Sequence, residues 1–571
     1  MIICGLKLTH DGAVALIDDG KLIFSYEMEK LNNNLRYTDI KDFSVVDRIL
    51  KENGYSLSGI DKLVIDGWGE IEKPQDFFRH TAKYGSGNIS FDLAKYGHLV
   101  INQPVLDRCE FLSSDGRIAY SSYMHVSGHV LGAYCTSDYA QKREGSFVLV
   151  WDGGMTPQLF YVDPAKKQIE NCRPLFLLNG NIYSFFAQRF PPFDKTKSGD
   201  ISIAGKVMAY IALGKPSPGL LYEFNYAYRY TLDRKREHTS QVLDRFAALV
   251  AEQNCSPEDA MATFHVFIEE LLVSSLKEKI GRFEGYKKNI CLAGGCALNI
   301  KWNRAIQSGG IFESVWVPPF PNDAGSAIGT ACCEMVVQEG WRPLDWEVYT
   351  GPAVADNFSS GNWVKYHYTI RQLAKLLYST NQPVILLDGR AELGPRALGN
   401  RSIIATAVNA SMKDRLNDMK NREGYRPVAP ICLEDDAPGI FDPGLPDPYM
   451  LYDHFVRDEW INKIPAICHL DGSARLQTVN MRTNPRLYLL LQEYKALSGI
   501  PVLCNTSANF NGKGFFPDVD SAIKWNKANF VWSSGFLFAR KGYEQMAGEN
   551  LQAVGANVPQ DAGVEVNDLI L

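Results

Sequence analysis

The sequence predicts a mixed α/β fold in two large domains, and three observations support this prediction. The chain has 571 residues, which is more than one hydrophobic core usually organises. A unit of strand, acidic turn and strand occurs twice in the first third of the chain. Residues 349–363 are rich in Gly, Ser, Pro and Asn, which is typical of a linker. We therefore expect one domain at residues 1–355 and a second at residues 356–571.

The two copies of the repeated unit are each predicted to form a hairpin with a polar kink. The first copy spans residues 2–26 and contains His10-Asp11-Gly12, and the second spans residues 147–169 and contains Asp152 followed by two glycines. Duplicated units with such turns at strand ends are typical of actin-like and sugar-kinase-like folds, which bind ligands between the copies. A region with helical periodicity at residues 244–282, followed by the apolar run NICLA, suits the same α/β class.

Composition and charge exclude several classes of function. The formal net charge is −6, with 22% charged residues, so nothing in bulk favours nucleic-acid binding. The twelve cysteines are scattered without a CxxC pair, which favours reduced thiols over a disulfide framework. There is no basic leader before an apolar stretch and no run of about 18 apolar residues. We expect a cytoplasmic protein that binds neither nucleic acid nor membrane.

Four residues are candidate ligands of a metal ion. His125 and His129 are four residues apart, so both imidazoles lie on one face if the segment is helical. Asp152 follows the apolar run FVLVW, and Asp323 lies at a predicted strand-to-helix junction. Mixed nitrogen and oxygen donors suit Fe(II), Mn(II) or Zn(II) and exclude a soft thiolate site. The alternatives are two polar residues on a partly exposed helix and an Asp that caps a helix.

Two glycine-containing segments are candidate nucleotide loops. The first, GGCALN at residues 294–299, follows a predicted strand, and its glycines would let the backbone approach a nucleotide closely. The second is Ala204-Gly205-Lys206, where Lys206 resembles a phosphate-binding lysine. Neither segment matches a Walker or dinucleotide motif. Each segment has an alternative interpretation as a tight turn, and Lys206 as a solvated lysine.

The second predicted domain concentrates arginines and amides in three segments and a strand end. The segments GRAELGPRALGNRS, KNREGYRPVAP and DGSARLQT place arginines beside Gly and Pro turns, which favours bidentate binding of phosphate or carboxylate oxygens. Just after a predicted strand, Asn505, Thr506, Ser507 and Asn509 offer neutral groups that fit a carbamoyl amide or a ribose. The alternatives are structural ion pairs for the arginines and a simple turn for the amides.

Taken in order, the segments HxxxH, WDGG, GGCALN, PNDAGSAIG, GPRALGNRS, KNREGYRP, DGSARLQT and NTSANFNGKG resemble the nodulation-factor and tobramycin-type O-carbamoyltransferase family over nearly the whole chain. GPRALGNRS is the most specific of them, and residues 5–30 look similar to hydroxymethylcephem carbamoyltransferases. The resemblance implies an N-terminal actin-like (ASKHA) domain, built from duplicated ribonuclease-H-like units, and a C-terminal YrdC-like α/β domain.

The resemblance also implies the chemistry. The C-terminal domain would form carbamoyl-adenylate from carbamoyl phosphate and ATP, the latter with Mg(2+), and the N-terminal domain would transfer the carbamoyl group to a small-molecule alcohol near a bound Fe(2+) ion. His125, His129, Asp152 and Asp323 would hold the metal, and Gly294, Gly295 and Asn299 would line the nucleotide pocket. His10, Arg396 and Lys420 would act in catalysis, with His10 as the base that takes the hydroxyl proton. The donor-binding residues would be Arg396, Lys420, Arg426, Arg475, Gln477, Thr478, Asn505 and Ser507.

Two segments depart from the family pattern, and several alternatives stay open. Residues 27–37 are less basic and aromatic than in many members, and Lys513 stands where an acid is common. A tRNA-modifying enzyme with the same adenylate chemistry is an alternative, against which the acidic net charge stands. A nucleotide-binding regulatory protein of the actin-like class is another. Our first expectation for the acceptor is a β-lactam intermediate in antibiotic biosynthesis, and a homodimer is possible.

Overall fold

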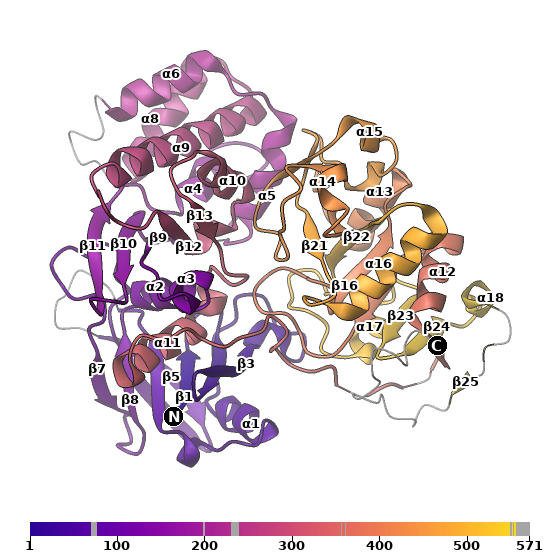
Figure 1. The fold of residues 1–571 in the computed structure, drawn as a ribbon, viewed down its shortest axis with the longest axis horizontal. Coiled ribbons are helices and arrows are strands. Elements are labelled where there is room, and N and C mark those ends of the chain that lie inside the picture. Colours follow the sequence, from indigo (N-terminus) through magenta and orange to yellow (C-terminus); the bar gives the residue numbers. More distant parts are fainter. Residues whose placement is uncertain are drawn as a thin grey trace. The chain divides into compact units, whose positions relative to one another are not determined.

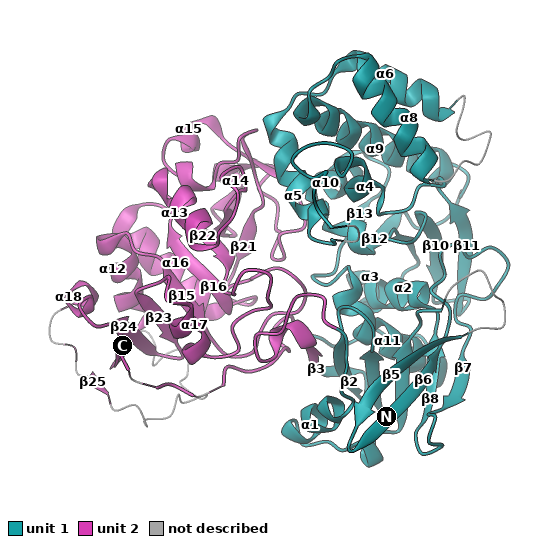
Figure 2. Cartoon of the chain, turned by 180° about the vertical axis from the view of Figure 1, so that it is seen from behind, with its two compact units in different colours: residues 1–23, 39–346 teal, residues 24–38, 347–571 magenta. Residues whose placement is uncertain are grey.

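A computed structural model describes residues 1–69, 77–197, 200–229, 239–355, 357–359, 361–548, 551 and 553–554. The chain forms two compact units (Figure 2). Unit 1 comprises residues 1–23 and 39–346, and unit 2 comprises residues 24–38 and 347–571. The boundary expected at residue 355 therefore lies in unit 2, close to the observed division, and unit 2 also includes the short segment 24–38 from near the start of the chain.

Unit 1 contains two large sheets with the same strand order and, among the described residues, a two-stranded sheet of β5 and β6; many of these strands are labelled in Figure 1. In the first, the order β3-β2-β1-β4-β8 continues to β7, and in the second the order is β11-β10-β9-β12-β13. In chain order, the first strand of each sheet (β1 or β9) pairs antiparallel with the second (β2 or β10) and parallel with the fourth (β4 or β12). The predicted duplication is thus present. The strands are β1 (Ile2–Lys7), β2 (Ala13–Asp18), β3 (Lys21–Glu27), β4 (Lys62–Asp66), β7 (Cys109–Leu112), β8 (Ala119–Tyr123), β9 (Ser146–Val150), β10 (Gln158–Asp163), β11 (Gln168–Pro174), β12 (Asn289–Ala293) and β13 (Ser314–Trp316).

Two helices lie between these sheets and carry candidate site residues. Helix α2 (His125–Cys135) contacts β9 and β12, and helix α11 (Ser326–Glu339) contacts β1, β2 and β4. The helices pack closely through glycines, since a Cβ added at Gly329 would lie 2.1 Å from the carbonyl oxygen of Gly128. Glycine is therefore required at this crossing. The close packing brings the start of α2 near the turn that precedes α11.

The remaining elements of unit 1 surround the sheets. A helical part packs around buried phenylalanines such as Phe224, Phe246 and Phe264. The helical region predicted at residues 244–282 is two helices, α8 and α9, because Ser256 caps a new helix that has Pro257 in its first turn. The bounds are α1 (Ser44–Glu52), η2 (Leu57–Gly59), β5 (Phe78–Tyr84), β6 (Gly87–Leu93), α3 (Asp138–Gln141), α4 (Ile182–Ala187), α5 (Ile203–Tyr210), η3 (Ile211–Leu213), α6 (Pro218–Ala227), α8 (Thr239–Glu252), α9 (Pro257–Ile280), η5 (Gly295–Leu298), α10 (Ile300–Ser308) and η6 (Asp323–Gly325).

The prediction of a loop at residues 204–206 is wrong, because these residues lie inside helix α5. Ile203, Val207 and Tyr210 are buried at helical spacing, which fixes one face of this helix against the protein. Gly205 lies on the exposed side, where an added Cβ would meet nothing within 4 Å. None of the described helices is long and apolar enough to span a bilayer.

The described residues of unit 2 form a nine-stranded sheet of order β21-β17-β22-β16-β15-β23-β24-β14-β25. Alternate residues of its strands point to opposite faces and enter two separate hydrophobic cores. Helices α12 and α16 cover one face, and helices α13, α14 and α17 cover the other. The helix and strand predicted at residues 370–378 and 383–387 are confirmed as α12 and β15. The sheet strands are β14 (Trp363–His367), β15 (Val384–Leu387), β16 (Arg401–Thr406), β17 (Ala429–Leu433), β21 (Gln477–Val479), β22 (Val502–Ser507), β23 (Phe530–Ser533), β24 (Phe536–Arg540) and β25 (Ala553–Val554).

The helices of unit 2 and a small sheet of order β18-β19-β20 complete this unit. Their bounds are η1 (Met28–Lys30), α12 (Ile370–Thr380), α13 (Ser411–Met419), α14 (Ala437–Ile440), β18 (Phe441–Asp442), β19 (His454–Val456), α15 (Asp458–Ile461), η7 (Pro465–Ile467), β20 (Ser473–Ala474), α16 (Pro485–Ser498), α17 (Val519–Trp525) and α18 (Glu544–Ala547).

A buried lysine anchors segment 24–38 within unit 2. Lys30 is 2% exposed, and its ammonium group donates to Glu27 at 2.7 Å and to the carbonyl oxygens of Glu392 and Gly394 at 2.6 and 2.8 Å. Leu35 forms a β-bridge with Lys513. The two segments that depart from the family pattern, residues 27–37 and the loop around Lys513, therefore lie side by side in unit 2.

Candidate functional site

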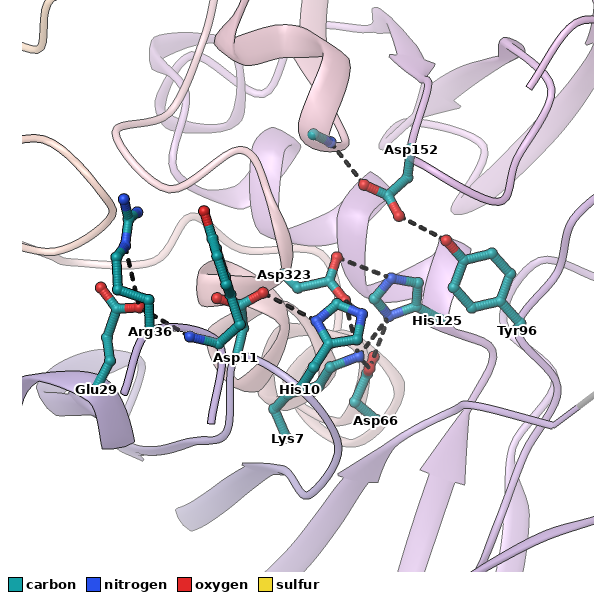
Figure 3. Close-up of polar contacts among 12 residues, drawn as sticks. Lys7, His10, Asp11, Glu29, Arg36, Asp66, Tyr96, His125, Asp152 and Asp323 are labelled. Atoms are coloured by element: carbon teal, nitrogen blue, oxygen red, sulfur yellow. Dashed lines mark hydrogen bonds and ion pairs between the residues drawn. The ribbon is translucent and has the colours of Figure 1, made fainter. Parts of the chain in front are cut away.

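The four predicted metal ligands converge in unit 1, and Figure 3 shows three of them, His125, Asp152 and Asp323. His125 and His129 lie one turn apart on α2, Asp152 follows β9, and Asp323 begins η6. All four are buried, and one potential ligand atom from each lies within 4.8 Å of all the others. The helix predicted from the HxxxH spacing is confirmed, and the partly exposed alternative is excluded because His125 is 0% and His129 5% exposed.

The donor atoms of this cluster face one another. Nε2 of His125 lies 3.1 Å from Nε2 of His129 and 3.3 Å from Oδ1 of Asp323, and His129 Nε2 lies 3.6 Å from the same oxygen. Two imidazole nitrogens and carboxylate oxygens at one point form a donor set that suits a divalent transition-metal ion. The residues present therefore fit a metal of the kind that the sequence predicts.

The carboxylate of Asp152 is fixed by two donors. Tyr96 donates its hydroxyl to one oxygen at 2.5 Å, and the backbone N–H of Gly295 donates to the other at 2.7 Å. Gly294 has φ +86°, and a Cβ there would lie 2.4 Å from the carbonyl oxygen of Trp151, so glycine is required. The predicted glycine pair after β12 thus holds Asp152. Asn299 caps α10 by accepting from the N–H groups of Lys301 and Trp302.

A buried ion network adjoins the cluster. Lys7 lies 2.8 Å from Asp66 and 3.1 Å from Asp323, and Asp66 also accepts from Nδ1 of His125 at 2.7 Å. Burial alone would lower the pKa of Lys7, but the carboxylates of Asp323 and Asp66 outweigh it and raise that pKa. Burial opposes ionisation of both acids, yet His125 and Lys7 lower the pKa of Asp66, and Lys7, His125 and His10 hold the pKa of Asp323 well below its usual value.

The same charges act on the histidines. Burial would lower the pKa of His125, but Asp66 and then Asp323 raise it to about 9. His10 is less buried; its Nδ1 lies 2.9 Å from Asp11 and its Nε2 lies 3.4 Å from Asp323. Burial likewise opposes protonation of His10, and Asp323 is the main cause that raises its pKa. The predicted base therefore lies beside the metal-ligand cluster and shares Asp323 with it.

The predicted donor-binding cations converge in unit 2. Arg396, Lys420, Arg426 and Arg475 are joined there by Arg422 and by Arg36 of segment 24–38. Burial lowers the pKa of each of the first four and of Arg422, and neighbouring cations lower it further for Arg396, Lys420, Arg422 and Arg475. Within the part of the chain that the structure describes, Arg475 Nε is buried and donates no hydrogen bond. We call these six residues the cation cluster, which suits a bound polyanion.

The predicted donor-binding residues differ in how many of their hydrogen-bonding groups already have partners within the protein. Lys420 donates to the carbonyl oxygens of Ser507 and Asn509 at 2.7 and 2.9 Å. The Asn505 amide donates to Gln477 and to the carbonyl oxygen of Ala397, while its own Oδ1 is buried with no hydrogen-bond partner among the described residues.

Several predicted residues lie in strands or in a helix. The Thr478 hydroxyl accepts from the N–H of Asp447 and donates to Glu434, so the structure uses it to join β21 to a loop. Asn505, Thr506 and Ser507 were predicted just after a strand, with a turn as the alternative. They are instead the last residues of β22, because they continue the ladder with β16. Gly205 and Lys206 lie in helix α5 and are not members of the metal-ligand cluster.

Models of the carbamoyltransferase N-terminus and C-terminus match residues 2–332 and 374–531. The chain is 45% identical to nodulation protein U of Rhizobium tropici, over 96% of this chain and 97% of that protein. The chain belongs to the carbamoyltransferase family. The predicted family is thus confirmed, and the protein is a carbamoyltransferase enzyme.

Other relatives of this carbamoyltransferase carry a named acceptor. The chain is 31% identical to the 3'-hydroxymethylcephem-O-carbamoyltransferase of Streptomyces clavuligerus, over 92% of this chain and 96% of that protein. Among solved structures, full-length HypF in the phosphate- and nucleotide-bound form covers 60% of this chain and 56% of its own, at 12% identity and a TM-score of 0.30, a likeness too weak to establish a shared fold.

Sequence reasoning missed several residues of this carbamoyltransferase. Lys7 and Asp66 end strands β1 and β4, and an ionisable residue at the end of an apolar strand is the only signal that marks them. Arg422 lies within the segment KNREGYRP, between two residues that were predicted. No local sequence pattern marks Arg36, because its place in the cation cluster depends on segment 24–38 belonging to unit 2.

Proposed function

We propose that this protein is an ATP-dependent O-carbamoyltransferase that forms carbamoyl-adenylate at the cation cluster of unit 2 and transfers the carbamoyl group to an alcohol at the metal-ligand cluster of unit 1. Family membership supports carbamoyl transfer. The assignment of the two reaction steps to two sites rests on the opposite charge of these buried sites. One site contains carboxylates and imidazoles, and the other contains cations.

The cation cluster supports the adenylation step. Carbamoyl phosphate and ATP with Mg(2+) are both polyanions, and arginines bind their oxygens through paired N–H groups. A water molecule would hydrolyse carbamoyl phosphate to carbamate and phosphate, and a carbamate oxygen would then attack the α-phosphorus of ATP and displace pyrophosphate. Arg475, Arg396 and Arg426 would neutralise the phosphate oxygens, and the unused Oδ1 of Asn505 would accept from the carbamoyl amide.

The unit 1 cluster supports the transfer step. Asp66, Asp152 and Asp323 are buried carboxylates near a single buried lysine, Lys7, which leaves two negative charges for a divalent cation to balance. Fe(2+), or another divalent ion such as Mn(2+), held by His125, His129, Asp152 and Asp323, would polarise the mixed anhydride and neutralise the leaving AMP.

His10 is proposed as the general base of this step. Its ring is partly exposed, so an acceptor can reach it, and its Nδ1 contact with Asp11 fixes the ring so that Nε2 faces the cluster. The acceptor hydroxyl would pass its proton to the imidazole while its oxygen bonds to the carbamoyl carbon and AMP leaves.

The finer fold assignments also stay proposals. The repeated strand order of unit 1, with helices α2 and α11 between two sheets, supports an actin-like (ASKHA) domain of duplicated ribonuclease-H-like units. For unit 2 we propose a YrdC-like fold on the basis of the sequence resemblance. The acceptor is proposed to be a small-molecule natural-product alcohol. The nodulation protein U relative is more identical to this chain than the cephem enzyme, so a hydroxymethylcephem is one candidate among several.

The test is to incubate the Fe(2+)-loaded protein with carbamoyl phosphate, ATP, Mg(2+) and a panel of alcohols, and to detect AMP and carbamate products by mass spectrometry. We expect AMP release to require both donors and to rise with a suitable alcohol. Absence of AMP and of pyrophosphate under all conditions would contradict the proposal. Tight tRNA binding at moderate salt, with carbamoylated tRNA as product, would favour the tRNA-modifying alternative.

A further inference from the structure

Asp66 contacts the Nδ1 side of the His125 ring, which is the side away from the other candidate ligands (Figure 3). It is the last residue of β4, is 2% exposed, and its Oδ2 lies 2.7 Å from Nδ1 of His125. A carboxylate only accepts, so Nδ1 carries a hydrogen, and once the ring is neutral it is Nε2 that has the lone pair. That lone pair faces Asp323 at 3.3 Å and His129 at 3.1 Å.

Lys7 fixes Asp66 in turn. β1 and β4 are adjacent parallel strands, which places Lys7 and Asp66 side by side at their ends. The Lys7 ammonium lies 2.8 Å from Oδ2 of Asp66, 3.1 Å from Oδ2 of Asp323 and 4.0 Å from the Trp68 ring centre. One cation therefore joins the carboxylate behind His125 to a carboxylate of the ligand set, and keeps both ionised.

We propose that Asp66, supported by Lys7, is a positioning residue that sets the tautomer and orientation of His125 for metal binding. This inference rests on the proposed function of the cluster. The competing explanation is a structural ion pair between Lys7 and Asp66 without influence on the metal. The two differ because a metal-binding histidine commonly depends on a carboxylate at its other nitrogen, whereas a structural pair affects stability alone.

The experiment uses the full-length protein stripped by a chelator and titrated with Co(2+), followed by visible absorption. Asp66→Ala is expected to weaken Co(2+) binding by about 10- to 100-fold and to change the absorption bands. Asp66→Asn keeps an acceptor oxygen but loses its charge, so we expect a smaller loss of roughly 3- to 10-fold. Lys7→Met should weaken binding in the same direction, because it releases Asp66.

Glu334→Gln is the matched control. Glu334 is a buried carboxylate on α11 that accepts from Arg108, Ser121 and Tyr123, so its loss costs stability while Co(2+) binding should stay at the wild-type level. Wild-type affinity and bands in Asp66→Ala would overturn the proposal. If that variant does not fold by circular dichroism, wild-type binding by Asp66→Asn overturns it instead. A wild-type protein that binds no Co(2+) would overturn both this inference and the proposed metal role, which is a different result from equal binding by wild type and variant.

Discussion

The two candidate sites of this carbamoyltransferase balance buried charge in opposite ways. In unit 1, carboxylates lie between Lys7 and the histidines, and the carboxylates and these cations favour each other's charged forms, although Lys7 itself opposes protonation of His125. In unit 2, the cations lie against one another, and burial together with like charge lowers the pKa of Arg396, Lys420, Arg422 and Arg475. On the proposed function, the first site is organised before a cation binds, whereas the second carries a repulsion that a bound anion would relieve.

This difference has a physical consequence for variants. Removing a residue from the unit 1 network leaves partners unsatisfied, so both function and stability should fall. Removing Arg475, whose Nε donates no hydrogen bond among the described residues, relieves repulsion in the unit 2 cluster, so function should fall while stability rises. Measuring both activity and stability for each variant therefore distinguishes the behaviour of the two sites.

The largest effect is expected from loss of a candidate metal ligand. Asp323→Ala removes a carboxylate shared by His125, His129, Lys7 and His10. Transfer to the acceptor should fall by about 1,000-fold or more, because several kcal/mol of charge stabilisation are lost. His80→Ala is the control, since His80 is a buried histidine of unit 1 whose ring contacts the carbonyl oxygen of Ile40. Near-normal carbamate formation by Asp323→Ala would show that the cluster does not serve transfer.

The pH dependence of stability should reveal the unit 1 network next. The pKa of His125 in the folded, metal-free protein is raised to about 9, above the value of about 6.5 for an unfolded histidine. Its protonated form therefore stabilises the fold fully below about pH 6.5, and this contribution, at most about 3 kcal/mol, is lost as pH rises through about 9. Urea unfolding at pH 6 and pH 9 should show the decrease in wild type and a smaller one in His125→Gln.

Binding of divalent ions should show the opposite trend. The proton on His125 must leave before Nε2 can bind a metal, so affinity should increase as pH rises toward about 9. Affinity that falls over this range would contradict the assignment of His125 as a ligand.

Two arginines sharpen the description of the cation cluster. Arg475→Met should raise the KM for carbamoyl phosphate by about 10- to 100-fold, because charge-assisted hydrogen bonds are lost, and should raise the melting temperature of the ligand-free protein. Arg401→Met is the matched control. Arg401 is buried and donates to the carbonyl oxygens of Asp388, Asn400, Pro352 and Gly389, so its loss should lower the melting temperature. Destabilisation by Arg475→Met would contradict the proposed relief of repulsion.

The smallest effect is expected at α5, outside both clusters. Gly205→Ala should stabilise the protein by roughly 0.5–1 kcal/mol, because the site is helical and an added Cβ meets nothing within 4 Å. Lys206→Ala should leave the KM for ATP unchanged. A raised KM for ATP in Lys206→Ala would restore the nucleotide role that the sequence predicted for this segment.

The comparison also shows what local sequence patterns can predict. The HxxxH spacing and the strand-end aspartates marked four candidate residues that the structure brings together, because helix periodicity and the duplicated unit fix where these side chains lie. Gly205 was misassigned because a Gly-Lys pair suggested a loop, although Ile203, Val207 and Tyr210 have helical spacing. Asp66 and Arg36 could not be predicted, since their roles depend on contacts between segments far apart in the sequence.

The most direct test of the division of labour is carbamoyl-phosphate-dependent exchange of pyrophosphate into ATP, measured in two variants of the full-length protein. His129→Ala alters the unit 1 cluster, and Arg475→Ala alters the unit 2 cluster. We predict that His129→Ala keeps the exchange near the wild-type rate but forms no carbamate product, whereas Arg475→Ala loses both. Loss of exchange in His129→Ala, or wild-type exchange in Arg475→Ala, would contradict the proposal that the adenylate forms at one cluster and is consumed at the other.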